Sequence, residues 1–185
     1  MATPYDRIEP PIRRFIEAQP VFFTGTAARD GRVNVSPKGM DSLRIMGPNR
    51  ILWRNLTGSG NETAAHLDNS PRMTLMWCAF EGAPMIVRAY GTARSIHRND
   101  RDWNQMDAHF TPDPAARQLF ELDIDLVQKS CGWAVPEMTL VGPRDTLANW
   151  AEAKGEQGLR DAWARDNATT IDGTPTYIVE RNLAD

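Results

Sequence analysis

A glycine-rich turn at residues 56–63, LTGSGNET, has residue types that could bind an anionic group. Gly58 and Gly60 let a ligand approach the backbone without a Cβ in the way. The helix expected to start here would present free N–H groups and a partial positive charge. No residue within 57–61 is charged. Positive charge for a bound phosphate would therefore come from elsewhere in the chain, from Arg32, Lys38 or Arg54.

The same turn also has a purely structural interpretation. Ser59 and Glu62 have the S-x-x-E spacing of a helix capping box. In that motif the serine hydroxyl accepts a hydrogen bond from the N–H of Glu62, and the glutamate carboxylate reaches back. A capping box accounts for both residues, and for the glycines beside them, without any ligand. The turn alone therefore leaves a phosphate site and a capped corner equally open.

A second stretch, residues 31–39 (GRVNVSPKG), could lie beside a ligand. The Asp30–Gly31 pair favours a hairpin turn, and the residues after it alternate as in a β-strand. Ser36 and Lys38 gather at the end of this strand. A flat aromatic ligand could lie along such a backbone and use its N–H and C=O groups. The alternative is a hairpin strand that carries an exposed lysine.

The elements that must position these stretches are mainly β-strands. Strand patterns occur at residues 21–28, 33–36, 43–46, 51–57, 73–80, 85–96 and 122–128. Helical patterns occur at residues 10–18, 62–69, 99–109, 113–120, 146–153 and 157–165. Because βαβ alternation is absent, we expect about six antiparallel strands in a small barrel with flanking helices; a sandwich is the nearest alternative. Gly91 marks a candidate β-bulge.

Length, composition and charge exclude several classes of protein. The 185 residues predict one mainly β (α+β) domain, with a barrel core at about 20–140 and C-terminal helices and an arm at 141–185. The net charge of −3 gives no reason to expect a nucleic-acid partner. No apolar run is long enough to span a membrane, and the first residues lack the apolar core of a signal peptide. Two separated cysteines favour a cytoplasmic setting, and the three scattered histidines predict no zinc site.

The order of the motifs resembles one known family. A hairpin, S-P-K-G at 36–39, T-G-S-G-N-E-T at 57–63 and R-x-Y-G at 88–91 follow one another as in the pyridoxamine 5′-phosphate oxidase-like family of FMN-binding split barrels. The resemblance covers about residues 10–140 and is clearest from 22 to 94. It implies a six-stranded antiparallel split β-barrel. It also implies a homodimer that binds FMN at the subunit interface, with both chains contributing to the pocket.

The resemblance also implies which residues contact FMN. The second strand would line the flavin ring, the turn would hold the phosphate, and a later strand and loop would complete the pocket. The residues concerned are Arg32, Val33, Asn34, Val35, Ser36, Lys38, Thr57, Gly58, Ser59, Gly60, Asn61, Thr63, Arg88 and Trp133. The S-R-K run that grips the phosphate in the oxidase is replaced here by Ser59-Gly60-Asn61. The Ser-Arg-Pro motif that binds pyridoxamine phosphate has no counterpart in residues 103–112, so we do not expect that substrate.

The function predicted from this resemblance is an FMN-dependent oxidoreductase with hydride transfer at flavin N5. Its substrate is unknown, and a nicotinamide would be a suitable electron donor. No side chain stands out as a general base, so no catalytic residue is assigned. Three alternatives stay open: a non-enzymatic flavin carrier or sensor, a haem-binding relative, and a deazaflavin-binding relative. Haem would need an axial ligand from His66 or His97, and a deazaflavin would need a more basic groove for its anionic tail.

Overall fold

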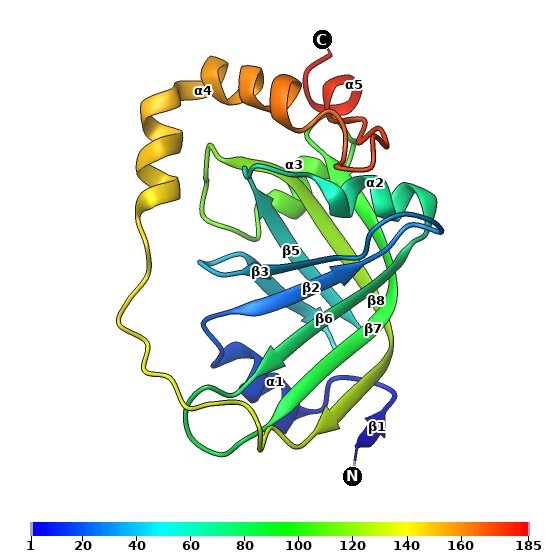
Figure 1. The fold of residues 1–185 in the computed structure, drawn as a ribbon, viewed down its shortest axis with the longest axis vertical. Helices are drawn as coiled ribbons and strands as arrows, with labels where there is room; N and C mark the ends of the chain where they lie inside the picture. Colours follow the sequence, from blue (N-terminus) through cyan, green and yellow to red (C-terminus); the bar gives the residue numbers. More distant parts are fainter. Residues whose placement is uncertain (1, 185) are drawn as a thin grey trace.

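The computed structural model describes residues 2–184 and has an eight-stranded antiparallel sheet with flanking helices (Figure 1). The strands are β1 (Thr3–Tyr5), β2 (Phe22–Thr26), β3 (Asn34–Lys38), β4 (Leu43–Gly47), β5 (Arg50–Leu56), β6 (Arg72–Cys78), β7 (Ile86–His97) and β8 (Ala116–Ser130). The helices are α1 (Pro10–Glu17), α2 (Glu62–Asn69), α3 (Trp103–Asp107), α4 (Thr146–Asp166) and α5 (Ile178–Asn182).

The strand order leaves the barrel open along one seam. The strands follow one another as β3-β2-β6-β7-β8-β5-β4, and β1 adds to β8. Within the described residues β3 and β4 form the two edges and do not pair with each other, although only a short connection joins them along the chain. The predicted antiparallel split barrel with flanking helices is therefore confirmed. The sheet has eight strands, more than the sequence patterns indicated.

Aromatic side chains fill the interior of the barrel. The ring of Trp53 on β5 lies 4.6 Å from that of Phe120 on β8 and 6.0 Å from that of Phe22 on β2, measured between centroids. Trp77 on β6 packs 6.1 Å from Phe22. Because these rings come from strands on both sides of the seam, their burial holds the two edges in a fixed relation.

The helix predicted at residues 113–120 is wrong, because most of this segment is the first half of β8. Residues 116–122 are buried on both faces of the strand. Phe120 and Leu122 face the barrel core, whereas Ala116 and Leu119 pack under α3. A strand buried on both sides loses the period-2 alternation that identifies strands in a sequence.

The other helical predictions differ mainly in their ends. The helices predicted at 10–18 and 62–69 are α1 and α2, whereas the one predicted at 99–109 contracts to α3. The two predicted at 146–153 and 157–165 form α4, which breaks at Gly155 with φ of 64° and ψ of 175°. The second half of α4 and α5 then pack on their own barrel, through the buried Trp163 and Ile178. None of the described helices is long and apolar enough to cross a membrane.

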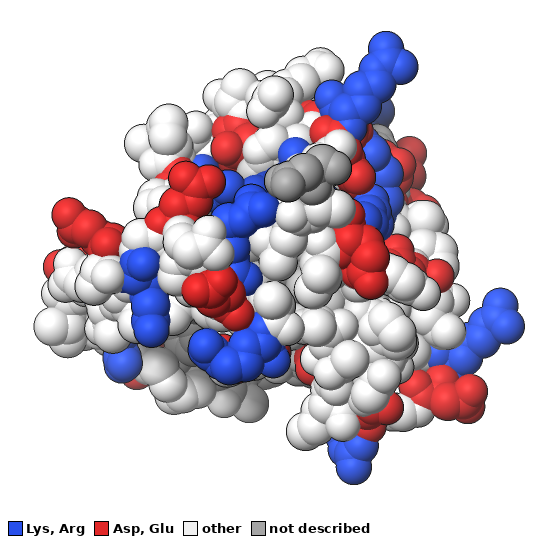
Figure 2. Space-filling view, turned by 90° about the horizontal axis from the view of Figure 1, so that it is seen from above, with Lys and Arg blue, Asp and Glu red and all other residues white. Residues whose placement is uncertain are grey.

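The charged side chains at this end of the molecule carry both signs. Viewed from above, Lys and Arg side chains are interspersed with Asp and Glu side chains over the visible face (Figure 2). Arg181 of α5, for example, pairs with Asp100 at 2.6 Å. Such mixed pairs neutralise the surface locally, so this face presents no broad patch of one sign.

The bulge predicted at Gly91 is confirmed and has a steric cause. The register of β7 against β8 shifts between Tyr90 and Gly91. A Cβ at Gly91 would overlap the backbone carbonyl of Asp123 on β8.

We expect Gly91→Ala to lower the free energy of unfolding by about 2 kcal/mol or more, because the backbone of one strand must move. Gly47→Ala is the control, since a Cβ there meets nothing within 4 Å. Urea titration of both variants checks this; equal stability losses would contradict it.

The contact between α5 and the barrel should respond to acid. His97 on β7 is fully buried and donates from Nδ1 to Oδ1 of Asn182 at 2.9 Å. Burial, with a smaller contribution from Arg181, lowers the pKa of His97 to about 4. The unfolded chain protonates His97 near pH 6.5, whereas the folded chain does so only near pH 4. The free energy of unfolding is therefore highest above pH 6.5 and falls as the pH is lowered toward 4.

We expect the free energy of unfolding to fall by about 2 kcal/mol between pH 7 and pH 5 in denaturant titrations, and this fall to be absent in His97→Asn. The same pH slope in the variant would contradict this.

Candidate functional site

A cavity of about 410 Å³ lies at the open seam of the barrel. We call it the seam cavity. It is bounded by β3, the connection to β4, the end of β5, the turn at residues 57–61 (the glycine loop), the start of α2, and single residues of β8 and α4. Its lining includes Asn34, Ser36, Lys38, Met40, Arg54, Thr57, Gly58, Ser59, Gly60, Asn61, Thr63, Arg117 and Leu147.

Strand alternation decides which residues of β3 face the seam cavity. Asn34, Ser36 and Lys38 share one face of the strand and line the cavity. Val33 and Val35 are 70% and 66% exposed, on the face turned away from it. The pairing of β3 with β2, from Phe22 opposite Lys38 to Thr26 opposite Asn34, fixes this arrangement.

The capping box that the spacing of Ser59 and Glu62 allowed, as one of two interpretations of the turn, is absent. Helix α2 begins at Glu62 with Asn61 as its N-cap, and no side-chain hydrogen bond caps it. Glu62 instead accepts from the backbone N–H of Ile171 at 3.1 Å, so its carboxylate binds the segment after α4, residues 167–184, which we call the C-terminal arm. The N–H groups of Ser59, Gly60 and Asn61 donate to no described residue. The glycine loop therefore keeps free backbone donors beside the cavity.

Asn61 has the most unusual environment in the glycine loop. Its side chain is 2% exposed, yet neither Oδ1 nor Nδ2 has a hydrogen-bond partner within residues 2–184. Buried amides are normally paired, because an unpaired one loses its hydration without compensation. Asn61 lines the seam cavity. An amide in this state is suited to bind a polar group in the cavity.

Arg117 on β8 was not predicted as a site residue and lies beneath the glycine loop. Its guanidinium donates to the carbonyl oxygens of Gly60 at 2.6 Å and Gly58 at 3.4 Å, and to Oδ1 of Asn167. Burial lowers the pKa of Arg117 to about 9, so the group stays charged at neutral pH. No local pattern indicates this role, because Arg117 falls within residues 113–120, whose pattern predicts a helix.

Lys38 and Arg54 supply two further positive charges. Lys38 Nζ lies 5.5 Å from the centre of the Trp53 ring, and burial together with the charge of Arg117 lowers its pKa to about 8. Arg54 is also buried, but Asp107 and Asp113 lie 3.7 and 3.8 Å from its guanidinium. Among the described residues, Lys38 and Arg117 have no carboxylate in ion-pair contact. Glu62 also lines the cavity, where its carboxylate accepts from Ile171 N–H. The cavity thus holds one carboxylate and two cations that no described carboxylate contacts as an ion pair.

The structure brings together nine of the fourteen predicted residues at the seam cavity. They are Asn34, Ser36, Lys38, Thr57, Gly58, Ser59, Gly60, Asn61 and Thr63. Thr57 contributes its backbone there, because its hydroxyl already donates to Ala115 O and accepts from Trp163 Nε1, both at 2.8 Å.

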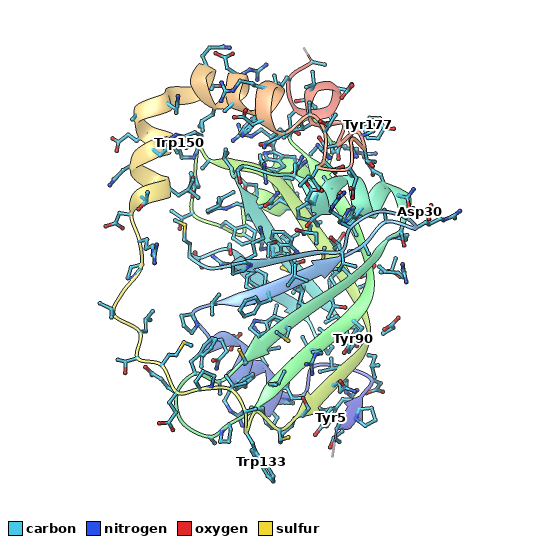
Figure 3. The ribbon with its side chains drawn as sticks, in the orientation of Figure 1. Tyr5, Asp30, Tyr90, Trp133, Trp150 and Tyr177 are labelled. Carbon is cyan, nitrogen blue, oxygen red and sulfur yellow. The ribbon has the colours of Figure 1, made fainter. Side chains whose placement is uncertain are left out.

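The other predicted residues lie elsewhere in this chain. Arg32 is at the exposed end of the β2–β3 hairpin and pairs with Asp172. Arg88 sits toward the far end of β7 and donates to Ser130 Oγ at 3.3 Å. Trp133 is 84% exposed and lies at the end of the barrel opposite Trp150 (Figure 3).

A larger cavity of about 1160 Å³, the outer cavity, adjoins the seam cavity. Both are lined by the end of β3, the connection after it and the glycine loop. The outer cavity is closed on its far side by the first half of α4 and the segment before it. The side chains there are largely apolar: Leu140, Pro143, Leu147 and Trp150. Ligands with a polar and an apolar part could therefore occupy both cavities.

Comparisons with known proteins identify the family of this chain. The family model described as pyridoxamine 5′-phosphate oxidase matches residues 8–131, more than half of the chain. The pyridoxamine 5′-phosphate oxidase family protein ustO of Aspergillus flavus is 33% identical over 191 residues, covering 92% of this chain and 76% of the relative.

Solved structures show the same fold at low sequence identity. HupZ of Group A Streptococcus has a TM-score of 0.51 at 14% identity, covering 64% of this chain and 91% of its own. A Lactobacillus delbrueckii protein named as a candidate pyridoxamine 5′-phosphate oxidase has a TM-score of 0.52 at 19% identity, covering 66% and 94%. The family expected from the order of the motifs is confirmed: this chain belongs to the pyridoxamine 5′-phosphate oxidase family.

Proposed function

We propose that this chain binds FMN, with the phosphate at the glycine loop, and serves as a flavin-dependent oxidoreductase. The observation that carries the proposal is the unbalanced polarity of the seam cavity. Within residues 2–184, the buried amide of Asn61 and the N–H groups of the glycine loop have no hydrogen-bond partner, and the cations of Lys38 and Arg117 have no ion-pair partner. A phosphate group would satisfy these three features together.

The residues present fit a phosphate group without further charge on the glycine loop itself. A Cβ on Gly58 or Gly60 would meet no protein atom closer than 3.6 Å, and neither residue has a positive φ. The chain's own packing therefore does not require glycine there, whereas close approach of a ligand to the backbone does. When bound, FMN supplies a ring that accepts a hydride at N5.

The protein's own groups would bind and orient the ligands. The glycine loop and Asn61 donate hydrogen bonds, and Lys38 places an ammonium group between the two cavities. Apolar side chains of the first half of α4 line the outer cavity that Lys38 also borders. We infer that a small organic substrate, or a nicotinamide acting as electron donor, reaches the flavin from the outer cavity. The substrate is not expected to be pyridoxamine phosphate, since residues 103–112 lack the motif for it.

We further propose a homodimer with FMN at its interface. Val35 on edge strand β3 and Val33 just before it are both exposed, and exposed apolar residues at a strand edge favour association. Arg88 and Trp133, which lie away from the cavities of their own chain, could then contribute to the partner's site.

A carrier or sensor would use the same site, so the two functions are separated by reactivity. Reduction of the bound flavin by NADH or NADPH supports the enzyme. The haem alternative fits less well, since no histidine lines either cavity. His66 and His97 are instead bonded within the described structure to Thr26 and Asn182.

The direct test is an absorption spectrum of the purified protein, with mass identification of the molecule released by heat. FMN is the expected product. A deazaflavin or haem in its place would select an alternative, and protein that neither retains nor takes up FMN at micromolar concentration would overturn the assignment.

Asn61→Ala should separate binding from folding. Since the side chain of Asn61 makes no hydrogen bond in the described structure, we expect the ligand-free variant to be as stable as the parent. We expect its FMN affinity to fall about tenfold. Asn49→Ala is the control, because Asn49 donates to Asp6 O and Ile124 O and should lose stability without losing affinity. Flavin-fluorescence titration and urea unfolding measure the two effects; unchanged FMN affinity in Asn61→Ala would refute the role.

Lys38 should make FMN affinity depend on pH. The ammonium group attracts the anion only while protonated, and its pKa is about 8. Affinity should therefore weaken about fourfold between pH 7 and pH 8.5 as the proton is lost. In Lys38→Met we expect a lower affinity that stays constant over this range. A parent affinity independent of pH would contradict the proposed charge.

A further inference from the structure

We propose that Arg117 is the positioning residue of the phosphate site and that Asn167, in the C-terminal arm, keeps its charge uncompensated. This inference rests on the proposed function and goes beyond it in one respect. It assigns to the arm, which lies outside the region matched by the family model, a part in selecting phosphate-bearing ligands.

Arg117 acts on the ligand through the backbone of the glycine loop. Its guanidinium donates to the carbonyl oxygens of Gly58 and Gly60. In a trans peptide the C=O of one residue and the N–H of the next point in opposite directions. Holding these two carbonyls toward Arg117 therefore turns the N–H groups of Ser59 and Asn61 away from it. Both of these N–H groups are free within the described structure.

The positive charge of Arg117 strengthens these donors. A cation bonded to the carbonyl end of a peptide increases the polarisation of that peptide, and so the attraction of its N–H for an anion. The guanidinium itself contributes its full charge in a water-poor setting. This arrangement supplies the charge that an S-R-K run carries on its side chains, and that Ser59-Gly60-Asn61 lacks.

Asn167 keeps that charge available because it is neutral. Its Oδ1 accepts from Arg117 and its Nδ2 donates to Gly58 O at 2.9 Å, so one amide holds both the cation and the loop. An aspartate would have the same size and could still accept from Arg117. It would, however, neutralise the guanidinium and repel the carbonyl of Gly58.

The C-terminal arm holds Asn167 and Arg117 in place. Thr176 donates to the carbonyl of Asn167 at 2.5 Å, and Asn182 donates to the carbonyl of Arg117 at 2.5 Å. All four residues are buried. The phosphate site is therefore built by three separated parts of one chain: the glycine loop, β8 and the arm.

The test is Asn167→Asp in the full chain, measured with FMN and with riboflavin, which lacks the phosphate. We expect FMN affinity to fall about tenfold or more while riboflavin affinity stays within about twofold, because only the phosphate senses the charge. A merely structural role would weaken both ligands alike. The matched control is Asn69→Asp, which adds the same charge on the exposed end of α2 and still accepts from Arg29 N–H.

Arg117→Lys and Arg117→Met provide a second comparison. The lysine variant keeps the charge and should retain part of the preference for FMN over riboflavin, whereas the methionine variant should lose it. If Asn167→Asp leaves this preference unchanged, or if both ligands weaken equally, the inference is overturned.

Failure of the proposed function gives a different result. In that case the parent protein would bind neither FMN nor riboflavin. Inorganic phosphate is then the probe, and its binding is followed as a rise in melting temperature. A rise in the parent and in Asn69→Asp, but not in Asn167→Asp, upholds the anion site without a flavin; no rise in the parent overturns it.

Discussion

The candidate site depends on one buried cation that is bonded only to neutral oxygens. Arg117 lies under the glycine loop, where its partners are two backbone carbonyls and one amide. Burying a charge without a counterion is unfavourable unless hydrogen bonds replace its hydration. The carbonyls of the glycine loop and the amide of Asn167 in the C-terminal arm meet this requirement.

The split barrel suits this arrangement because its seam exposes a place that a closed barrel would fill with side chains. Within the described residues, the edge strands β3 and β4 do not pair with each other, and aromatic packing across the interior fixes their relative position. Because successive side chains of a strand point to opposite faces, neighbouring residues in and just before β3 lie in different surroundings. Ser36 and Lys38 face the cavity, and Val33 and Val35 face outward. One strand thus provides a ligand-binding face and a candidate association surface.

The sequence predicts elements that depend on local patterns, but not site residues whose positions depend on tertiary packing. Turn glycines, alternation and motif order predicted the hairpin, α2, the bulge at Gly91 and the family. The spacing of Ser59 and Glu62 predicted a cap, but the arm competes for Glu62 and leaves Asn61 as the N-cap. Arg117 was missed because burial on both faces of β8 removes the strand pattern. Asn167 was missed because a bond across more than a hundred residues leaves no trace in local spacing.

The break at Gly155 divides α4 into two halves that contact different parts of the molecule. The second half is anchored, since Trp163 donates to Thr57 at the glycine loop. The first half carries Leu147 and Trp150 on the wall of the outer cavity. A left-handed glycine between them uncouples the direction of one half from the other. Trp150 lines the outer cavity alone, whereas Leu147 lines both cavities, so a substitution at Trp150 can reshape the outer cavity without touching the lining of the anion site.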